Sequence, residues 1–373
     1  MASQPVRAAV VGCGFQGRLH LECFAELEDA EVVAVCDRDP ERLRAASDEF
    51  AVAAGFTAHD ELLRSQPVDL LTICTMPDSH AEIARGAFAA GAGVLCEKPL
   101  AADLEGAFAI AEAAKRTGRY FSVGFNLRHS SAALAVKALV EESRLGVPVC
   151  ARGSMLETEV PWWGPHQVSA ISGGGAIAST AVHMIDLLMW LAGNPRPLTA
   201  TASAARLFPR KRGSAVPEFA NVDRYDVEDL AFGHVRFESG FWLTIEGAWT
   251  WDEPGWECRF DLVGDGGQAS APPLRVSAER SGELIDLTDG AEGDLDFPSS
   301  VQRELGAAVE AVRAGACSAE TIEQAVEVQA VVDALYRSAD EGREVEIADV
   351  RARLRAFDGG SRSATKAAAG SER

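Results

Sequence analysis

The sequence has no apolar run that approaches the roughly 20 residues needed for a membrane-spanning helix. Its first residues, Met1-Ala2-Ser3-Gln4-Pro5, have neither the basic flank nor the long apolar segment of a signal peptide. We therefore expect no membrane partner and a cytoplasmic location. The sequence also has no internal repeat.

Positive charge is scarce. The chain has 35 lysines and arginines against 56 aspartates and glutamates, which gives a formal net charge of −21. An acidic surface repels nucleic acid and anionic lipid, so we expect neither as a partner. A dinucleotide is not excluded, because it needs only a few local hydrogen-bond donors.

Closely spaced cysteines are missing as well. None of the eight cysteines belongs to a Cys-x-x-Cys pair or lies at the spacing of zinc ligands, so no metal site is predicted. Several lie in apolar runs, where a buried and reduced thiol is the usual state. The eight are Cys13, Cys23, Cys36, Cys74, Cys96, Cys150, Cys258 and Cys317.

The chain has 373 residues, enough for two domains that each have a core of their own. Residues 6 to about 125 alternate short apolar runs with helical patterns, which is typical of a parallel, doubly wound sheet in an α/β domain. The strands predicted in this region are Val6–Val11, Glu31–Cys36, Leu70–Cys74, Val94–Cys96 and Tyr120–Gly124. The predicted helices are Arg18–Glu28, Pro40–Phe50, Ala81–Ala90 and Leu104–Thr117.

The pattern changes at about residue 150. Several predicted strands follow with few helices between them, which indicates a mostly antiparallel sheet in a second, α+β domain. A helix is predicted over Thr180–Leu191, and helical spacing returns over residues 300–338. The predicted strands are Val149–Glu157, Leu198–Leu207, Glu228–Phe237, Gly240–Thr250, Cys258–Gly264 and Ala269–Val276.

A glycine-rich turn follows the first predicted strand. Gly12-x-Gly14-x-x-Gly17 stands between a β-branched run and an amphipathic pattern, the context of a dinucleotide-binding turn. Gly12 permits the tight turn, Gly14 lets the backbone approach a pyrophosphate, and Gly17 lets the helix pack on the strand. Free N–H groups at the start of the helix would bind the phosphates, and we expect Phe15 and Gln16 to contact the cofactor. The alternative is a glycine turn without a ligand.

An acidic residue closes the next predicted strand. Asp37 lies 20 residues after Gly17, where its carboxylate can accept hydrogen bonds from an adenosine ribose and repels a 2′-phosphate. This favours NAD. Arg38 leaves NADP as the alternative, because a neighbouring arginine can hold that phosphate. Arg38 could instead be a solvated charge over the adenine.

A lone lysine follows the apolar run Val94–Cys96. Lys98 stands between Glu97 and Pro99, at the carboxyl end of a predicted strand, a position that points into the ligand crevice of such a sheet. Partial burial would lower the pKa of the amine toward the range useful for proton transfer. The alternative is a surface lysine beside a turn.

A run of three glycines, Gly173 to Gly175, precedes the predicted helix that carries His183. Glycines let a backbone pass close to another group, and the helix places His183 and Asp186 three residues apart on one face, with Ser179 one turn earlier. A histidine in an apolar helix is more often a core residue. The preceding glycines favour a functional one.

These motifs, in this order and spacing, resemble the glucose–fructose oxidoreductase, inositol dehydrogenase and MocA-like (Gfo/Idh/MocA) family over about residues 5 to 350. Besides the glycine turn, Cys96-Glu97-Lys98-Pro99-Leu100 and the glycine run with His183 and Asp186, the resemblance rests on three short motifs. They are Thr75-Met76-Pro77-Asp78-Ser79-His80, Gly124-Phe125-Asn126-Leu127-Arg128 and Val227-Glu228-Asp229.

The resemblance implies a Rossmann domain, an open-faced sheet domain, and a homo-oligomer, dimer or tetramer, formed through that sheet. Residues 1–125 would be the NAD(P)-binding domain and residues 126–350 the domain for substrate and oligomer contacts. The polar tail 359–373 has few large apolar side chains and is expected to be disordered.

The resemblance also implies roles for single residues. Lys98 and His183 would flank the reacting carbon over the nicotinamide and handle the proton. Further cofactor contacts would come from Thr75, Pro77, His80 and Glu97. Substrate contacts would come from Arg128, Trp162, Trp163, His166 and Ser179, together with Lys98 and His183. Packing in a core or an interface is the alternative for the two tryptophans.

The chain departs from the family at one position. Sugar and inositol dehydrogenases of this family usually carry an aspartate four residues before the histidine, where this chain has Ser179. A carboxylate there would stabilise the imidazolium, whereas serine can only orient the ring. Either Lys98 is the main acid/base, or another carboxylate supplies the support, for which Asp186 is a candidate.

The function predicted from these observations is an NAD(P)-dependent oxidoreductase. It would transfer a hydride between nicotinamide and a secondary alcohol or ketone of a small sugar, cyclitol or sugar derivative. Three alternatives stay open: an NAD-dependent glycosidase that uses transient oxidation, a nucleotide-sugar ketoreductase, and a non-catalytic ligand sensor.

Overall fold

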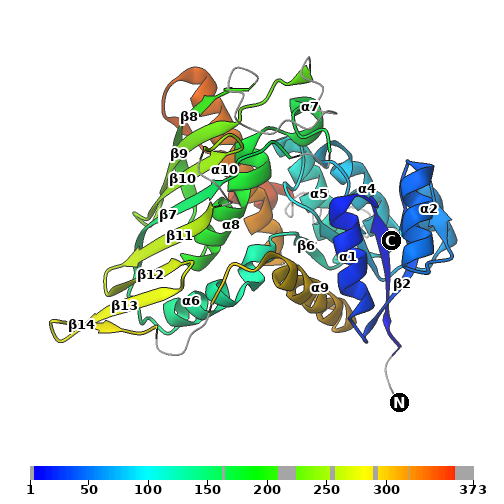
Figure 1. Cartoon of the computed structure of the whole chain (residues 1–373), viewed down its shortest axis with the longest axis horizontal. Helices are drawn as coiled ribbons and strands as arrows, with labels where there is room; N and C mark the ends of the chain where they lie inside the picture. The colour runs from blue at the N-terminus through cyan, green and yellow to red at the C-terminus, as the bar shows by residue number, and fades with distance from the viewer. Residues whose placement is uncertain are drawn as a thin grey trace, which may run out of the picture.

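The computed structural model describes residues 4–161, 164–208, 224–252, 257–288, 293–317 and 319–357. Two β-sheets dominate it (Figure 1). The nine-stranded sheet stands at the left of the view, and helices lie between it and the domain of the six-stranded sheet at the right. The tail 359–373 lies outside the described residues, so its predicted disorder stays a prediction.

The six-stranded sheet is parallel throughout, with the order β3-β2-β1-β4-β5-β6 of a Rossmann fold. The first predicted strand is confirmed, while the two-residue β3 is too short for a sequence signal. The strands are β1 (Val6–Val11), β2 (Ala30–Cys36), β3 (Gly55–Phe56), β4 (Leu70–Ile73), β5 (Gly93–Cys96) and β6 (Phe121–Val123). The helices are α1 (Phe15–Ala25), α2 (Pro40–Glu49), α3 (His59–Ser65), α4 (His80–Ala89) and α5 (Leu104–Thr117).

The nine-stranded sheet has the order β14-β13-β12-β11-β7-β10-β9-β8-β15. Among the described strands of this sheet, β7 and β10 alone pair in parallel, so the prediction of a mostly antiparallel sheet is confirmed. Its strands are β7 (Pro148–Leu156), β8 (Pro197–Ala205), β9 (Leu230–Phe237), β10 (Trp242–Ala248), β11 (Glu257–Gly264), β12 (Gly267–Ala271), β13 (Arg275–Arg280), β14 (Glu283–Asp286) and β15 (Val345–Glu346).

One face of this sheet is covered and the other is open. In β10, Leu243 and Ile245 are buried, whereas Trp242 between the same strands is 40% exposed. Successive side chains of a strand point to opposite faces, so this alternation places the helices on one side only. Figure 1 shows α8 and α10 on the side that faces the Rossmann domain.

The predicted bounds of two strands differ from those in the structure. The predicted strand Ala269–Val276 is divided between β12 and β13, because Pro272 and Pro273 cannot donate to a ladder. The strand predicted from Glu228 begins at Leu230 instead.

The remaining helices are α6 (Ser131–Glu141), α7 (Ser169–Ser172), α8 (Val182–Leu191), α9 (Phe297–Arg313) and α10 (Ala319–Glu341). The helical region predicted over residues 300–338 is therefore two helices. Leu305 and Val309 of α9 share a core with Val10 and Leu21 of the Rossmann domain. The chain thus returns to its first sheet after completing the second, and the predicted division at residue 125 stays a prediction.

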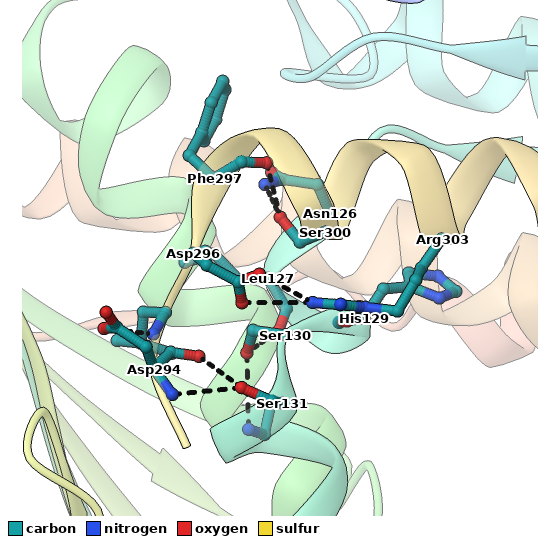
Figure 2. A network of polar contacts seen from close by, with 12 residues as sticks. Asn126, Leu127, His129, Ser130, Ser131, Asp294, Asp296, Phe297, Ser300 and Arg303 are labelled. Carbon is teal, nitrogen blue, oxygen red and sulfur yellow. Dashed lines mark hydrogen bonds and ion pairs between the residues drawn. The ribbon is translucent and has the colours of Figure 1, made fainter. Parts of the chain in front are cut away.

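A polar network fixes the start of α9 to the segment that follows β6 (Figure 2). The side-chain amide of Asn126 donates to Ser300 Oγ at 2.8 Å. Arg303 pairs with Asp296 at 3.0 Å and donates to the carbonyl of His129 at 2.6 Å. The contacts of Asn126 with Ser300 and of Arg303 with His129 each span 174 residues of sequence, and they hold the start of α9 against the segment after β6.

One helical stretch, Ser169–Leu191, is long and apolar enough to cross a membrane, but 94% of its most apolar window is buried inside the protein. It runs through α7 and α8. Burial of this extent is typical of a core helix.

Candidate active site

A cavity of about 950 Å³ opens at the carboxyl ends of β1, β2, β4 and β5. Ligands of open parallel sheets bind at this edge. The opposite wall comes from the end of β7 and from a π-helix, Ile177–Ala181, that leads into α8. The cavity therefore has one wall from each sheet domain.

The glycine turn forms the floor of the cavity. Gly12 has a φ of 95°, and a Cβ there would lie 2.5 Å from the carbonyl oxygen of Cys74. A Cβ on Gly17 would lie 1.8 Å from the carbonyl oxygen of Gly12, so the fold itself requires both glycines. A Cβ on Gly14 would meet nothing within 4 Å. Gly14 therefore keeps open a cradle at the start of α1, beside Phe15 and Gln16, that fits a pyrophosphate.

Asp37 ends β2 and lines the cavity. Its carboxylate accepts hydrogen bonds from the backbone N–H groups of Cys13 at 2.7 Å and Asp39 at 2.8 Å. These bonds fix the carboxylate at the place predicted for a ribose contact. Arg38 lines the same region, and so does Arg42 of α2, which the sequence did not single out.

The segment after β4 reaches the cavity only in part. Thr75 and Pro77 line it, but His80 does not. The ring of His80 is buried, with Nε2 3.0 Å from the carbonyl of Thr75 and Nδ1 3.1 Å from that of Pro99. The His80 ring thus connects the segment after β4 to the segment after β5, and its predicted cofactor contact stays a prediction.

Glu97 is buried at the end of β5. It accepts hydrogen bonds from Gln16 Nε2 at 2.9 Å, and its Oε1 lies 3.1 Å from His20 Nε2. Burial raises the pKa of Glu97, but the bond with His20 and the charges of His20 and Lys98 outweigh it, so the pKa is lowered. Glu97 therefore stays ionised and anchors the start of α1 to β5. No sequence motif singled out His20, which also contacts Cys74.

Lys98 lies on the cavity wall, as predicted. Its Nζ donates to the carbonyl of Ser179 at 2.8 Å, which joins the two walls. Burial lowers the pKa of the amine, although the charges of Glu97 and Glu157 oppose the shift. The amine is thus held in place, and its neutral form, which can accept a proton, is more populated than in an ordinary lysine.

His183 lines the same cavity as Lys98, from the opposite wall. The side chain is 4% exposed, and its Nδ1 has no hydrogen-bond partner among the described residues. Burial, helped by the charge of Lys98, lowers the pKa of His183 well below its usual value, so the ring is neutral. The π-helix with Ser179 directly precedes it, a distortion that often marks functional sites.

The glycine run approaches protein groups, not open space. A Cβ on Gly174 would lie 2.0 Å from the hydroxyl of Tyr336, and one on Gly175 would lie 1.8 Å from the carbonyl oxygen of Glu228. Glu228 accepts hydrogen bonds from the N–H of Ile177 at 2.8 Å and the hydroxyl of Tyr336 at 2.8 Å. The glycines therefore let Glu228 clamp the start of the π-helix.

Arg128 is not on the cavity wall. Its guanidinium forms a two-pronged ion pair with the buried Asp186, at 2.8 and 2.5 Å, and donates to Gln324 at 3.1 Å. The predicted substrate contact of Arg128 therefore stays a prediction without support from the cavity lining. The ion pair also removes Asp186 as the carboxylate that could support His183, because both its oxygens are bound by Arg128.

Glu157 is the site residue that the sequence did not reveal. It follows the last residue of β7 and lines the cavity. Burial raises the pKa of Glu157 from 4.5 to about 7, although the charge of Lys98 opposes the shift. Its only sequence signal is an acid directly after an apolar strand, the same signal that marked Asp37.

The remaining predicted contacts lie in the segment after β7. His166 lines the cavity, and burial lowers its pKa to about 3. Trp162 and Trp163 lie outside the described residues. Within the part of the chain that the structure describes, no group of three or more His, Cys, Asp and Glu side chains could hold a metal ion.

Two family models match the chain. Residues 6–125 match the oxidoreductase family with an NAD-binding Rossmann fold, and residues 133–270 match the GFO/IDH/MocA C-terminal domain. The chain belongs to the Gfo/Idh/MocA oxidoreductase family. The family resemblance, the fold class and NAD as the cofactor are thereby confirmed, and the chain is an NAD(P)-dependent oxidoreductase.

Curated relatives align over almost the whole chain. D-glucoside 3-dehydrogenase of Escherichia coli (strain K12) is 26% identical over 353 residues, which cover 93% of this chain and 99% of that protein. Inositol 2-dehydrogenase 2 of Saccharopolyspora erythraea is 29% identical over 338 residues, covering 89% and 93% respectively. Both names describe dehydrogenases.

Among solved structures, levoglucosan dehydrogenase in complex with NADH and levoglucosan superposes with a TM-score of 0.82. The match covers 92% of this chain and 100% of that chain at 21% sequence identity. It shows that the two proteins share a fold.

Proposed function

We propose that this Gfo/Idh/MocA protein is an NAD-dependent dehydrogenase that oxidises a secondary hydroxyl group of a small sugar or cyclitol. The observation that carries the proposal is the presence of Lys98 and His183 in one cavity beside the glycine turn, each from a different wall. The lowered pKa of Lys98 makes it the proton acceptor. The relatives named for glucosides and inositols support a polyhydroxylated ring as the substrate.

The residues at the cofactor end favour NAD over NADP. Gly14, Phe15 and Gln16 would hold the pyrophosphate, and Asp37 would bind the ribose hydroxyls and repel a 2′-phosphate. Thr75, Pro77 and Glu97 would complete this part of the site. When bound, NAD supplies the hydride acceptor.

The residues at the substrate end divide two tasks. Lys98 takes the hydroxyl proton, and the carbonyl of Ser179 holds its amine in place. His183 is neutral, so it binds the same hydroxyl by a hydrogen bond without competing for the positive charge. His166, Trp162 and Trp163 are proposed to contact the rest of the ring.

The proposal is tested by absorbance at the reduced-nicotinamide band, with purified protein, NAD or NADP, and a panel of inositols, aldoses and glucosides. Formation of NADH with one class of polyol, and slower reaction with NADP, is expected. Absence of NADH with every member of the panel, in protein that binds NAD, would contradict the proposed function.

We also propose that the protein is a cytoplasmic homo-oligomer joined through the open face of the nine-stranded sheet. Phe232 and Trp242 are 42% and 40% exposed on adjacent strands of this face. Aromatic side chains are enriched in protein interfaces. Light scattering after size-exclusion chromatography should give a dimer or tetramer, and Trp242→Glu should dissociate it; a monomeric wild type would contradict the proposal.

A further inference from the structure

We propose that Glu157 is a positioning residue for the reaction: its carboxylate balances the ammonium that Lys98 becomes when it accepts the substrate proton. This inference rests on the proposed function and assigns the missing carboxylate of the site. The first observation is position. Glu157 and Lys98 line the same cavity from opposite sheets, and the charge of each acts on the other.

The backbone of Glu157 is rigidly held. Its N–H donates to the carbonyl of Ala248 at 2.8 Å, and its carbonyl accepts from the N–H of Trp251 at 3.0 Å. The ladder of β7 and β10 therefore continues to Glu157, and the side chain projects from a fixed point. A charged side chain acts consistently on one amine when the backbone that carries it is held in place.

The carboxylate of Glu157 is not held by hydrogen bonds to the described residues. No hydrogen-bond donor among the described residues binds it, whereas Glu97, the other carboxylate that acts on Lys98, is bound to Gln16 and His20. Asp186 is bound to Arg128. Of these three acids, only Glu157 is free to respond when the charge of Lys98 changes.

The site needs such a group because the position before His183 is not acidic. Ser179 lies four residues before His183, and its carbonyl already accepts from Lys98. The Nδ1 of His183 has no partner within the described residues, so no described carboxylate supports the ring. Stabilisation of the transferred proton is therefore expected at Lys98.

The groups around Glu157 set the pH range over which its carboxyl group ionises. Burial and the charge of Glu159 raise the pKa of Glu157 to about 7, and the charge of Lys98 lowers it. Near neutral pH a small change in the Lys98 charge thus changes the protonation of Glu157. The charges of Lys98, Glu159 and Cys258 are the ones coupled to Glu157. Other titratable side chains line the same cavity: His166, His183, Glu97, Asp37, Arg38, Arg42, His59, Asp78, Glu82, Cys36 and Cys74.

The proton balance is simple. The O–H bond of the substrate breaks and an N–H bond forms on Lys98, so positive charge appears next to Glu157. An ionised Glu157 stabilises that charge by electrostatic attraction in the partly buried cavity. Removal of the carboxylate should therefore lower the pKa of Lys98.

The experiment measures the pKa of Lys98 directly. The full chain without ligand is labelled with trace acetic anhydride across a range of pH, and the labelled peptides are quantified by mass spectrometry. The chain has only five lysines, so Lys98 is resolved and Lys115 is an internal reference. In Glu157→Gln the apparent pKa of Lys98 should fall by about 1 to 3.

Two variants complete the design. Glu157→Asp keeps the charge and should restore most of the wild-type titration. Glu279→Gln removes the same charge from an exposed position on β13 and should leave the Lys98 titration unchanged. With NAD and an active polyol, the acidic limb of kcat/KM in Glu157→Gln should move to lower pH, with a lower maximal rate.

An unchanged Lys98 titration in Glu157→Gln would overturn the inference, whatever the activity. A change in KM and melting temperature with the wild-type pH profile would also overturn it, because it would show a structural role only. Absence of polyol-dependent NADH formation in the wild type would instead overturn the proposed function, and the labelling result would still decide whether Glu157 and Lys98 are coupled.

Discussion

The two walls of the cavity are built differently. The wall from the six-stranded sheet consists of strand ends and the turns that directly follow them, such as Gly12 after β1 and Asp37 after β2. The wall from the nine-stranded sheet combines the end of β7 with a π-helix that a distant acid, Glu228, clamps through backbone N–H groups. The first wall is local in sequence, and the second is assembled from several segments.

Two glutamates show what this difference does to chemistry. Glu97 is supplied with donors by α1, the helix that follows the glycine turn, and its pKa is lowered. Glu157 is equally a strand-end acid, but it has no described donor and its pKa is raised to about 7. Burial raises the pKa of both carboxylates, so the opposite net shifts come from the hydrogen bonds and charges around each one.

The largest effect is expected at the residue that bridges the walls. Lys98→Ala should lower kcat by about 10²- to 10⁴-fold, because the proton acceptor is lost, while the affinity for NAD should change little. Steady-state kinetics and NAD titration would measure this. Lys115→Ala, on the surface of α5, is the control, and wild-type kcat in Lys98→Ala would refute the assignment.

The next largest effect concerns support behind the walls. Arg128→Gln should lower the free energy of unfolding by about 3 to 5 kcal/mol, because Asp186 stays buried without its partner. The KM for the polyol should be unchanged, since Arg128 does not line the cavity. Arg128→Gln combined with Asp186→Asn should recover part of the stability. A large rise in KM with wild-type stability would return Arg128 to the substrate site.

A pair of glycine variants would separate folding from binding within the first wall. Gly14→Ala should leave the melting temperature unchanged, because its Cβ has open space, but should weaken NAD binding at least about tenfold, or ~1.4 kcal/mol. Gly17→Ala should lower the free energy of unfolding by about 3 kcal/mol or more, because its Cβ overlaps the Gly12 carbonyl. Calorimetry would measure both, and equal stability losses would contradict this division.

The smallest effect would test the second wall through pH. Because the pKa of Glu157 is raised from 4.5 to about 7 in the folded protein, wild-type stability is lost as pH rises through this range. Glu157→Gln should therefore equal the wild type near pH 4 and exceed its free energy of unfolding by roughly 1 to 3 kcal/mol above pH 7. Urea unfolding at both pH values would show this, and a constant difference would contradict the raised pKa.

The predicted site residues line the cavity where a motif and its ligand-facing group are neighbours, and their contacts with a ligand stay predictions. Gly12, Gly14, Asp37 and Lys98 each lie within a few residues of a strand end, and all reach the cavity. His80 and Arg128 lie near the site, but their side chains bind groups behind the cavity wall and do not line the cavity. His80 binds backbone carbonyls and Arg128 binds Asp186, and tertiary packing is needed to bring Arg128 and Asp186 together.

The sequence by itself determined a parallel, doubly wound sheet, the glycine turn after its first strand and the placement of a lysine at the crevice. These follow from local periodicity and from the rule that parallel strands end at one edge. Only the tertiary structure decided which acid faces that lysine. Glu157 and Lys98 are 59 positions apart and come from different sheets, so their pairing depends on how α9 and α10 pack the two domains together, which no local pattern records.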